Sequence, residues 1–300
     1  MSLARQRLLI LGCGGQLGAE LARRFATDSA WSVTALSRSQ LNLADADQVR
    51  SAVRHHAPQI LINAAAYTAV DRAESEPELA FAVNATAPGI LAEEMARLNG
   101  WLLHYSTDYV FDGSGSAPWI ESDPTDPLNV YGASKLAGED AIAAVGAQHL
   151  IFRTSWVYAA EGRNFLHTML RLGRERSALS IVNDQHGAPT TAEVLAAATT
   201  DLAARLREGF APKSGVFHMS CGGETTWFGF AETIFAAFPA HQPPPALTPI
   251  RTADYPTPAR RPLNSRLDCT LLADTLHLRL PHWQEAFASV AAALSAREKH

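Results

Sequence analysis

The sequence predicts an α/β protein with a doubly wound parallel sheet and a smaller, mostly C-terminal α+β region. Three observations support this fold class. Short apolar runs alternate with helical stretches through the first half of the chain, a glycine cluster follows the first apolar run, and the alternation loosens after about Trp156. Repeated strand–helix alternation implies parallel strands joined by right-handed crossovers, with helices on both faces of the sheet.

Five predicted strands form the regular part of the chain, at Arg7–Leu11, Trp31–Leu36, Ile60–Asn63, Trp101–Ser106 and His149–Thr154. They contain few charged residues, as strands buried on both faces do. Helices are predicted between them, at Gln16–Thr27, Asp45–His55 and Tyr131–Ala144. A capping box at Ser75-Glu76-Pro77-Glu78 predicts the start of another helix, and Asn99-Gly100 predicts the end of a helical stretch that reaches Leu98.

The rest of the chain is predicted to be less regular. Further helices are expected at Phe165–Arg174, Thr191–Leu206, Trp227–Ala237 and Trp283–Ala296, and short strands at Leu179–Val182 and Val216–Met219. The proline-rich stretch from Pro239 to Pro262 favours a loop rather than secondary structure. We therefore expect a first domain over residues 1–156, to which the chain returns around residues 190–220, and a second region over 157–300.

Composition excludes several classes of protein. The chain has 300 residues, 47% of them apolar and 18% charged, so it can bury a substantial core. The net charge is −5 and basic residues are scattered, so neither a nucleic acid nor a membrane surface is expected as a partner. Three cysteines without a CxxC pair, and no export signal or membrane span, predict a cytoplasmic protein.

A glycine cluster, Gly12-Cys13-Gly14-Gly15-Gln16-Leu17-Gly18, lies where the first predicted strand turns into the first helix. The pattern GxGxxG fails because Leu17 takes the place of the third glycine, but GxxGxxG fits Gly12, Gly15 and Gly18. Small residues let the backbone approach a pyrophosphate at the helix N-terminus. This position in a βαβ series predicts a Rossmann-type dinucleotide site, and a tight turn without a ligand is the alternative.

The choice of dinucleotide is predicted at the end of the second strand. An NAD site usually places a carboxylate there to bind the ribose hydroxyls. Here the chain reads Leu36-Ser37-Arg38. Ser37 and Arg38 suit a 2′-phosphate, which favours NADPH, with NADH as the alternative if Arg38 points into solvent.

Tyr131 and Lys135 stand four residues apart, which places the phenol and the ammonium on one face of a helix. A nearby ammonium favours the phenolate, so the pair suits proton transfer near neutral pH. Hydroxyls in the string Tyr105-Ser106-Thr107-Asp108-Tyr109, after the fourth strand, are candidates to orient a carbonyl. The alternative is that Tyr131 and Lys135 are ordinary helix residues without a catalytic role.

With these residues the chain resembles the extended short-chain dehydrogenase/reductase family, nearly end to end. Within that family it is similar to the branch that reduces nucleotide-linked keto-sugars. Strings throughout the chain carry the resemblance, among them Asn63-Ala-Ala-Ala-Tyr-Thr-Ala-Val-Asp71, Ser106-Thr-Asp-Tyr-Val-Phe111, Pro127-Leu-Asn-Val-Tyr-Gly-Ala-Ser-Lys135, Arg153-Thr-Ser-Trp-Val-Tyr158, Asp184-Gln-His-Gly-Ala-Pro-Thr190 and Arg260-Arg-Pro-Leu-Asn-Ser265.

The resemblance implies NADPH-dependent reduction of the C4 keto group of dTDP-4-dehydro-L-rhamnose to dTDP-L-rhamnose. The first domain would bind NADP, and the second region would mainly bind the nucleotide-sugar substrate. The implied catalytic residues are Thr107, Tyr131 and Lys135, and the implied substrate residues are Thr107, Asp108, Tyr109, Trp156, Arg260 and Asn264. The implied cofactor residues are Gly12, Gly15, Gln16, Leu17, Gly18, Ser37, Arg38, Asn42, Leu43, Ala64, Ala65, Tyr67, Tyr131 and Lys135.

Two positions depart from the pattern of the resembled branch. Asn42 stands where relatives often carry an acidic residue near the adenine. Some relatives form a homodimer around Mg²⁺ held by glutamates, and Glu20 and Glu193 match two of those positions. The expected third position falls in Val290-Ala291-Ala292-Ala293, which has no carboxylate. Solvated surface carboxylates are therefore the alternative for Glu20 and Glu193.

Two other functions remain open from the sequence. The first is a nucleotide-sugar epimerase or dehydratase of the same superfamily, in which Asp108 would be the acid/base group. The second is a non-catalytic, NADP-binding regulatory subunit, against which the presence of Thr107, Tyr131 and Lys135 together argues.

Overall fold

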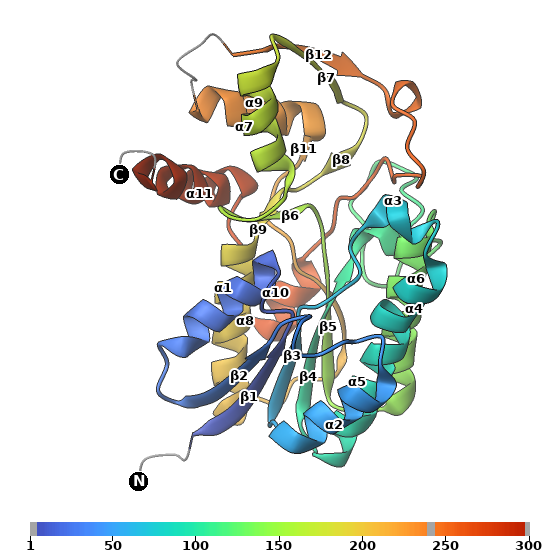
Figure 1. The fold of residues 1–300 in the computed structure, drawn as a ribbon, viewed down its shortest axis with the longest axis vertical. Helices are drawn as coiled ribbons and strands as arrows, with labels where there is room; N and C mark the ends of the chain where they lie inside the picture. Colours follow the sequence, from blue (N-terminus) through green and yellow to red (C-terminus); the bar gives the residue numbers. More distant parts are fainter. Residues whose placement is uncertain (1–4, 239–243, 298–300) are drawn as a thin grey trace.

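The computed structural model describes residues 5–238 and 244–297 (Figure 1). A six-stranded sheet forms its centre, with the order β10-β5-β4-β3-β1-β2 and all neighbours parallel. Its strands are β1 (Gln6–Leu11), β2 (Trp31–Leu36), β3 (Ile60–Asn63), β4 (Trp101–Thr107), β5 (His149–Thr154) and β10 (Gly215–His218). The α/β class predicted from the sequence is confirmed.

The strand order reverses between β1 and β3. From β1 the chain passes to β2 on one side, and then crosses back to β3 on the other side of β1. In the register of the sheet, Leu11 of β1 lies beside Asn63 of β3, which in turn lies beside His104 of β4. Ligands of doubly wound folds bind outside the carboxyl ends of the strands at such a switch point.

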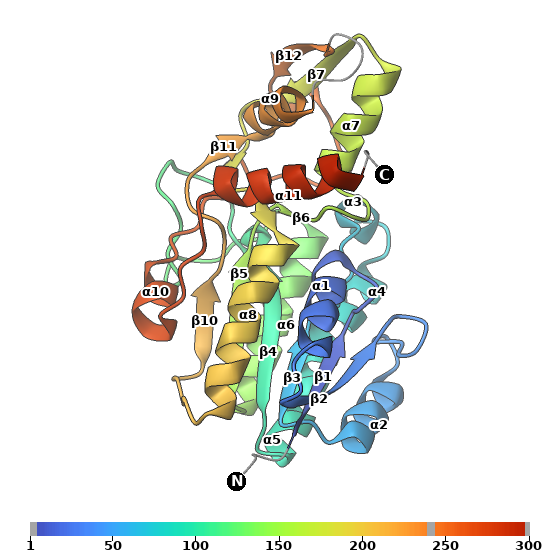
Figure 2. The ribbon, with the colours of Figure 1, turned by 90° about the vertical axis from the view of Figure 1, so that its left-hand side faces the viewer.

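Helices cover both faces of the sheet (Figures 1 and 2). One face carries α1 (Gln16–Ala26) and α8 (Ala192–Arg207), and the other carries α2 (Ala46–His56), α5 (Ala87–Arg97) and α6 (Val130–Val145). Their apolar residues recur every three or four positions, so each helix turns one side to the strands. α1 buries Leu17, Leu21 and Phe25 in this way.

The segment between β3 and α5 differs from the prediction. Ser75 does not cap a helix, because its hydroxyl donates to the carbonyl of Arg72 at the end of the short helix α3 (Val70–Ala73). The next helix, α4 (Pro77–Phe81), begins after Glu76 without a side-chain cap. A single π-helical turn, η1 (Ala82–Thr86), then joins α4 to α5. The predicted stop after Leu98 is present, with Asn99 in the left-handed conformation.

A second region lies above the carboxyl edge of the sheet (Figure 1). It contains α7 (Phe165–Glu175), α9 (Trp227–Ala237) and α11 (Trp283–Arg297), together with the strand pair β7 (Ala178–Val182) and β12 (Ala246–Ile250). These elements share an apolar cluster of their own, which includes Leu166, Phe230, Trp283 and Phe287. α11 runs across the junction between this region and the sheet (Figure 2).

Part of the proline-rich stretch was wrongly predicted to be a loop. Ala246–Ile250 forms β12, which pairs in parallel with β7 although it contains Pro249. A strand with one partner can place a proline where no N–H is needed. Pro239 and Pro243 lie outside the described residues. α10 (Thr270–Leu276), which packs against β10, was not predicted either.

Short elements complete the described chain. β6 (Val157–Tyr158) pairs with β9 (Thr190–Thr191), and β8 (His186–Gly187) pairs with β11 (Thr225–Thr226). Two 3-10 turns are η2 (Asp108–Val110) and η3 (Thr252–Asp254). Within residues 5–238 and 244–297, no helix combines the length and apolar character that crossing a membrane requires.

Candidate active site

A cleft of about 1540 Å³ opens at the carboxyl edge of the sheet, around the switch point between β1 and β3. Most of the residues singled out from the sequence line it. They are Gly12, Gly15, Gln16, Leu17, Ser37, Arg38, Asn42, Leu43, Ala64, Ala65, Tyr67, Thr107, Asp108, Tyr109, Tyr131, Lys135 and Trp156. Glu20 and Glu193 also line it, whereas Gly18 lies just behind the wall.

The glycine turn brings two stretches of backbone into direct contact. Gly12 has φ +86°, and a Cβ there would lie 2.8 Å from the Cα of Ala65. A Cβ on Gly18 would lie 2.1 Å from the carbonyl oxygen of Gly12, so the first turn of α1 can pack against the loop only if residue 18 is glycine. Gly15 is the N-cap of α1 and has no side chain. This end of the helix can therefore receive an anion.

The ends of β2 and β3 form the next part of the wall. The Ser37 backbone N–H donates to Gln40 Oε1 at 3.0 Å, which holds the Ser37–Gln40 turn in place, and Arg38 in this turn lines the cleft. Beyond β3, the Tyr67 backbone N–H donates to Asn84 Oδ1 at 2.8 Å, and Asn84 Nδ2 lies 3.0 Å from Ser134 Oγ. Asn84 belongs to η1, and no motif in the sequence around it predicted that it would support the site.

Thr107 is the last residue of β4, and its side chain is buried. Its hydroxyl donates to Asp108 Oδ1 at 3.1 Å and accepts from the Tyr109 backbone N–H at 3.2 Å. Burial raises the pKa of Asp108 to about 7, although hydrogen bonds from Ser265 and Thr107 act in the opposite direction. A carboxyl group that exchanges a proton near neutral pH therefore lies directly behind the Thr107 hydroxyl.

Tyr131 lies in the first turn of α6, which is held close to the end of β4. Asn129 caps the helix by accepting from the Gly132 N–H at 2.8 Å, and a Cβ on Gly132 would lie 2.1 Å from the Tyr109 carbonyl oxygen. The rings of Tyr131 and Tyr109 meet edge to face, with centroids 5.7 Å apart. Burial raises the pKa of Tyr131 to about 12, against the effect of a hydrogen bond with Thr107.

Lys135 follows Tyr131 by one helical turn and is almost fully buried. Its Nζ donates to the Tyr105 carbonyl oxygen at 2.6 Å and lies 3.2 Å from His104 Nε2. Burial lowers the pKa of Lys135 to about 8, and the charge of Glu139 partly offsets this effect. The structure thus brings Thr107, Tyr131 and Lys135 to one side of the cleft. It also adds His104, which sequence analysis missed.

Trp156 has the unusual φ of +48°, and its ring lies flat on that of Trp227. Both side chains line the cleft, although they come from the end of β5 and the start of α9. Residues 159–163 also line it, and Asn164 Nδ2 donates to Gln16 Oε1 at 2.7 Å. Trp227 and this segment were not predicted to belong to the site, because neither is part of a recognisable motif.

Two predicted substrate residues lie apart from the cleft lining. The Asn264 amide is buried and donates to the carbonyl oxygens of Ser114 and Ala117, at 3.2 and 2.8 Å. Arg260 is exposed, and its carbonyl oxygen accepts from Asn129 Nδ2 at 2.8 Å. In this structure both residues hold loops around the site, so a direct contact of either with substrate stays a prediction.

A family model described as the RmlD substrate binding domain matches residues 6–296. The dTDP-4-dehydrorhamnose reductase of Burkholderia thailandensis is 47% identical over 288 residues, which are 93% of this chain and 96% of that protein. The chain belongs to the dTDP-4-dehydrorhamnose reductase family.

Solved structures of this family have the same fold. A dTDP-4-dehydrorhamnose reductase from Clostridium acetobutylicum matches with a TM-score of 0.89 and 32% identity, over 96% of this chain and 99% of that one. The Bacillus anthracis reductase, solved in complex with NADP, matches with a TM-score of 0.87 and 32% identity, over 98% and 99% of the two chains. The resemblance inferred from the sequence is confirmed.

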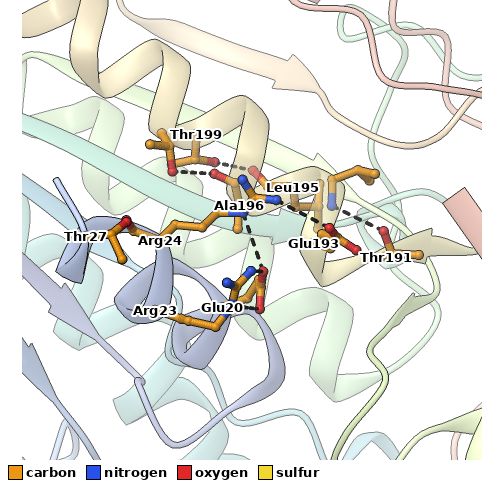
Figure 3. A network of polar contacts seen from close by, with 11 residues as sticks. Glu20, Arg23, Arg24, Thr27, Thr191, Glu193, Leu195, Ala196 and Thr199 are labelled. Carbon is orange, nitrogen blue, oxygen red and sulfur yellow. Dashed lines mark hydrogen bonds and ion pairs between the residues drawn. The ribbon is translucent and has the colours of Figure 1, made fainter. Parts of the chain in front are cut away.

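The magnesium site that the resemblance implied does not fit the residues present here. Arg24 lies between the two candidate ligands, with Nε 3.4 Å from Glu20 Oε1 and Nη2 3.6 Å from Glu193 Oε1 (Figure 3). Arg23 also binds Glu20, and this hydrogen bond is the main reason that the Glu20 pKa is lowered. Guanidinium groups thus take the place that a cation would need.

No group of three or more His, Cys, Asp or Glu side chains in the described part of the chain is arranged to hold a metal. The predicted Mg²⁺ is therefore not supported. The structure describes one chain, so the predicted homodimer stays a prediction.

Proposed function

We propose that this protein reduces the C4 keto group of dTDP-4-dehydro-L-rhamnose to the hydroxyl of dTDP-L-rhamnose, with NADPH as the hydride donor. The observation that carries the proposal is the position of Tyr131. Its phenol lines the same cleft as the glycine turn, with Thr107 and Lys135 beside it, in a chain of the reductase family. The cleft is long enough to reach from this turn to Trp156 and Trp227, at the junction with the second region.

The residues near the glycine turn fit a nicotinamide dinucleotide. Gly12 and Gly18 leave room for the backbone to approach a pyrophosphate, and the start of α1 supplies N–H groups. Ser37 and Arg38 support a contact to the 2′-phosphate, because a guanidinium group binds phosphate in a bidentate manner. When bound, NADPH supplies the hydride, and the protein supplies orientation and a proton.

Tyr131 is the proposed proton donor to the sugar oxygen. With its pKa raised to about 12, the phenol is protonated throughout the working range of pH. It gives up its proton when hydride transfer places negative charge on the keto oxygen, because that oxygen then becomes basic enough to accept it. The Thr107 hydroxyl is proposed to orient that oxygen, and Lys135 to hold the nicotinamide ribose and assist the return of the proton to Tyr131.

The second region is proposed to bind the nucleotide-sugar. Asp108 and Tyr109 lie beside the proposed reacting carbonyl, and Trp156 with Trp227 forms an aromatic wall at the junction of the two parts. The division proposed for the chain is therefore a cofactor-binding part over residues 1–156 and a mainly substrate-binding part over 157–300. Residues 159–163, which reach back to Gln16, would contact both ligands.

The direct test follows NADPH absorbance while the purified protein meets dTDP-4-dehydro-L-rhamnose. We expect oxidation that requires the keto-sugar, with dTDP-L-rhamnose as the product. Absence of oxidation despite NADPH binding would refute the proposal and favour a regulatory subunit. A tightly retained NAD, with interconversion of nucleotide-sugars and no net oxidation, would favour an epimerase or dehydratase.

A further inference from the structure

A chain of buried polar groups lies directly behind Lys135. Asn63 is the last residue of β3, and His104 is its neighbour across the sheet on β4. Both side chains are completely buried, and neither lines the cleft. Buried polar groups are costly unless each donor meets an acceptor. Once the donor at the fixed end of this series of hydrogen bonds is known, the donor and acceptor of each following bond can be deduced.

The fixed end is the backbone N–H of Ala65, which can only donate. Asn63 Oδ1 lies 3.2 Å from it and must accept, so the other end of the same amide, Nδ2, faces His104 Nδ1 at 3.0 Å. An amide nitrogen donates and does not accept. His104 Nδ1 therefore has to accept and carries no hydrogen.

The remaining proton of the imidazole must then be on Nε2. Burial lowers the pKa of His104 well below its usual range, so the ring is neutral and carries one proton. Nε2–H points at Lys135 Nζ, 3.2 Å away. An ammonium group has no lone pair and would oppose a donor to a donor, whereas a neutral amine accepts this hydrogen bond.

We propose that His104, oriented by Asn63, is a positioning residue that stabilises Lys135 as a neutral amine beside Tyr131. In this form each part of Nζ has a defined role. Its lone pair accepts from His104, one N–H donates to the Tyr105 carbonyl oxygen, and the second N–H is free to face the cleft. Burial alone favours an amine, but it does not orient the lone pair.

The charged groups around Lys135 do not supply an alternative. Glu139 on the same helix favours the ammonium, but Arg153 of β5 binds it at 2.7 Å and the Ser106 hydroxyl also donates to it. Tyr131 on α6 is a neutral phenol at working pH. His104 is thus the group from β4 that acts specifically on the lone pair of Nζ.

The consequence for turnover rests on the proposed function. When Tyr131 gives its proton to the substrate oxygen, the phenolate that forms raises the proton affinity of the Lys135 amine. Nζ can then take a proton from water and return it towards the phenolate. One proton leaves Tyr131 and one from water replaces it, so both side chains end as they began. An amine with a pKa near the working pH suits such a relay.

The first experiment needs no substrate and reads the tautomer in the wild-type protein. In ¹⁵N-histidine-labelled wild-type protein, the couplings between ring protons and nitrogens show which nitrogen of His104 is protonated, and the His104→Gln variant assigns the signal. We expect the Nε2–H tautomer from about pH 6 to pH 9. An Nδ1–H tautomer would overturn the proposal, because Nε2 would then accept from an ammonium.

The second experiment measures the Lys135 titration by ¹³Cε-lysine NMR, which is practicable because the chain has three lysines. In His104→Met an apolar side chain fills the buried position, and the donor to Nζ is lost. We expect the Lys135 midpoint to rise by about one pH unit, the change in proton affinity that one hydrogen bond makes. An unchanged or lower midpoint would show that burial alone sets it.

Two further variants make the result specific. In His104→Gln, Asn63 can donate to the new carbonyl oxygen, which turns the new amide N–H towards Nζ and keeps the midpoint close to that of wild type. His149→Met replaces another buried histidine, whose Nδ1 contacts the Ala147 carbonyl oxygen, and should leave the midpoint unchanged. If His104→Met does not fold, His104→Gln and the tautomer measurement still decide the matter.

Turnover provides the functional readout. If keto-sugar reduction is established, we expect the low-pH limb of kcat, on which protonation removes the amine form of Lys135, to move upward in His104→Met together with the Lys135 midpoint. The KM for the keto-sugar should change little. A merely structural role would alter stability without moving the limb. If no keto-sugar is reduced, the proposed function fails, but the tautomer and the lysine titration still test the present inference.

Discussion

The ring of Trp156 lies on the ring of Trp227, with centroids 3.7 Å apart and planes inclined by 11°. The stack joins the end of β5 to the start of α9, and a Cβ on Gly187 would lie 2.7 Å from the Trp156 ring. Trp227 is held in turn by a hydrogen bond from its Nε1 to Gln185 Oε1 at 3.0 Å. This aromatic pair therefore joins the two parts of the chain at the wall of the cleft.

Replacing Trp227 with alanine should weaken binding of the keto-sugar. Loss of a stacked ring removes about 0.5–1.5 kcal/mol beyond the lost burial, so we expect the KM for the sugar to rise by up to about tenfold. Trp227→Phe keeps a ring and should lie close to wild type. Steady-state kinetics at saturating NADPH measures both variants, and equal KM values for all three proteins would remove Trp227 from the substrate site.

Replacing Tyr131 with phenylalanine should abolish reduction while sparing NADPH binding. The loss of a positioned proton donor lowers kcat by about 10²–10⁴-fold. Tyr158→Phe is a matched control, because the Tyr158 hydroxyl is buried and has no hydrogen-bond partner among the described residues. NADPH affinity by fluorescence and turnover by absorbance provide the two readouts. Retained turnover in Tyr131→Phe would exclude its proposed role.

Arg38→Ala should weaken NADPH much more than NADH. A charge-assisted hydrogen bond to a phosphate contributes about 1.5–3 kcal/mol, so the Kd for NADPH should rise by about 10–100-fold. Binding of NADH, which lacks the 2′-phosphate, should be little affected. Arg279→Ala removes an exposed guanidinium 3.9 Å from Asp274 and serves as the control. A similar loss for both dinucleotides would contradict the 2′-phosphate assignment.

Gly14 and Gly18, both in the glycine cluster, should respond differently to replacement by alanine. At Gly18 a Cβ would lie 2.1 Å from the Gly12 carbonyl oxygen, so the backbone must move and dinucleotide binding should be lost. At Gly14 the nearest atom would be Ser37 Cβ at 3.8 Å, an ordinary contact, so Gly14→Ala should keep its fold. Calorimetric titration with NADPH distinguishes them, and equal binding by both variants would argue against this packing.

Asp108 should make the protein less stable as the pH rises towards 7. Its pKa is raised from 3.8 to about 7 by burial, so the folded state binds this proton more tightly than the unfolded chain. The stabilisation is complete below about pH 4 and is lost as the pH rises through about 7. It amounts to up to about 4 kcal/mol for a shift of about three units. In Asp108→Asn this contribution is absent.

The test compares urea unfolding of wild type and Asp108→Asn between pH 4 and pH 8. We expect the difference in unfolding free energy to favour wild type at low pH and to shrink, or reverse, at high pH. A difference that does not depend on pH would show that Asp108 is ionised throughout this range in the folded protein.

Those parts of the fold and the site that depend on residues close together in the sequence could be predicted from it. The apolar runs predicted the strands, and the i, i+4 spacing of Tyr131 and Lys135 placed both side chains on one side of α6. Ser75 and Pro249 show where local patterns fail. Ser75 belongs to the end of α3 instead of capping α4, and Pro249 is accommodated in β12 because β7 is its only partner strand in the described structure.

The glycine turn, the Tyr131–Lys135 pair and the family could be predicted from the sequence, because each depends on residue types at fixed short spacings. The surroundings of these residues depend on the folded structure. It set His104 and Asn63 behind Lys135, Trp227 against Trp156, and Arg24 between Glu20 and Glu193. Residues in these contacts come from different strands and helices, and their side chains meet only because the sheet register and helix packing bring them together.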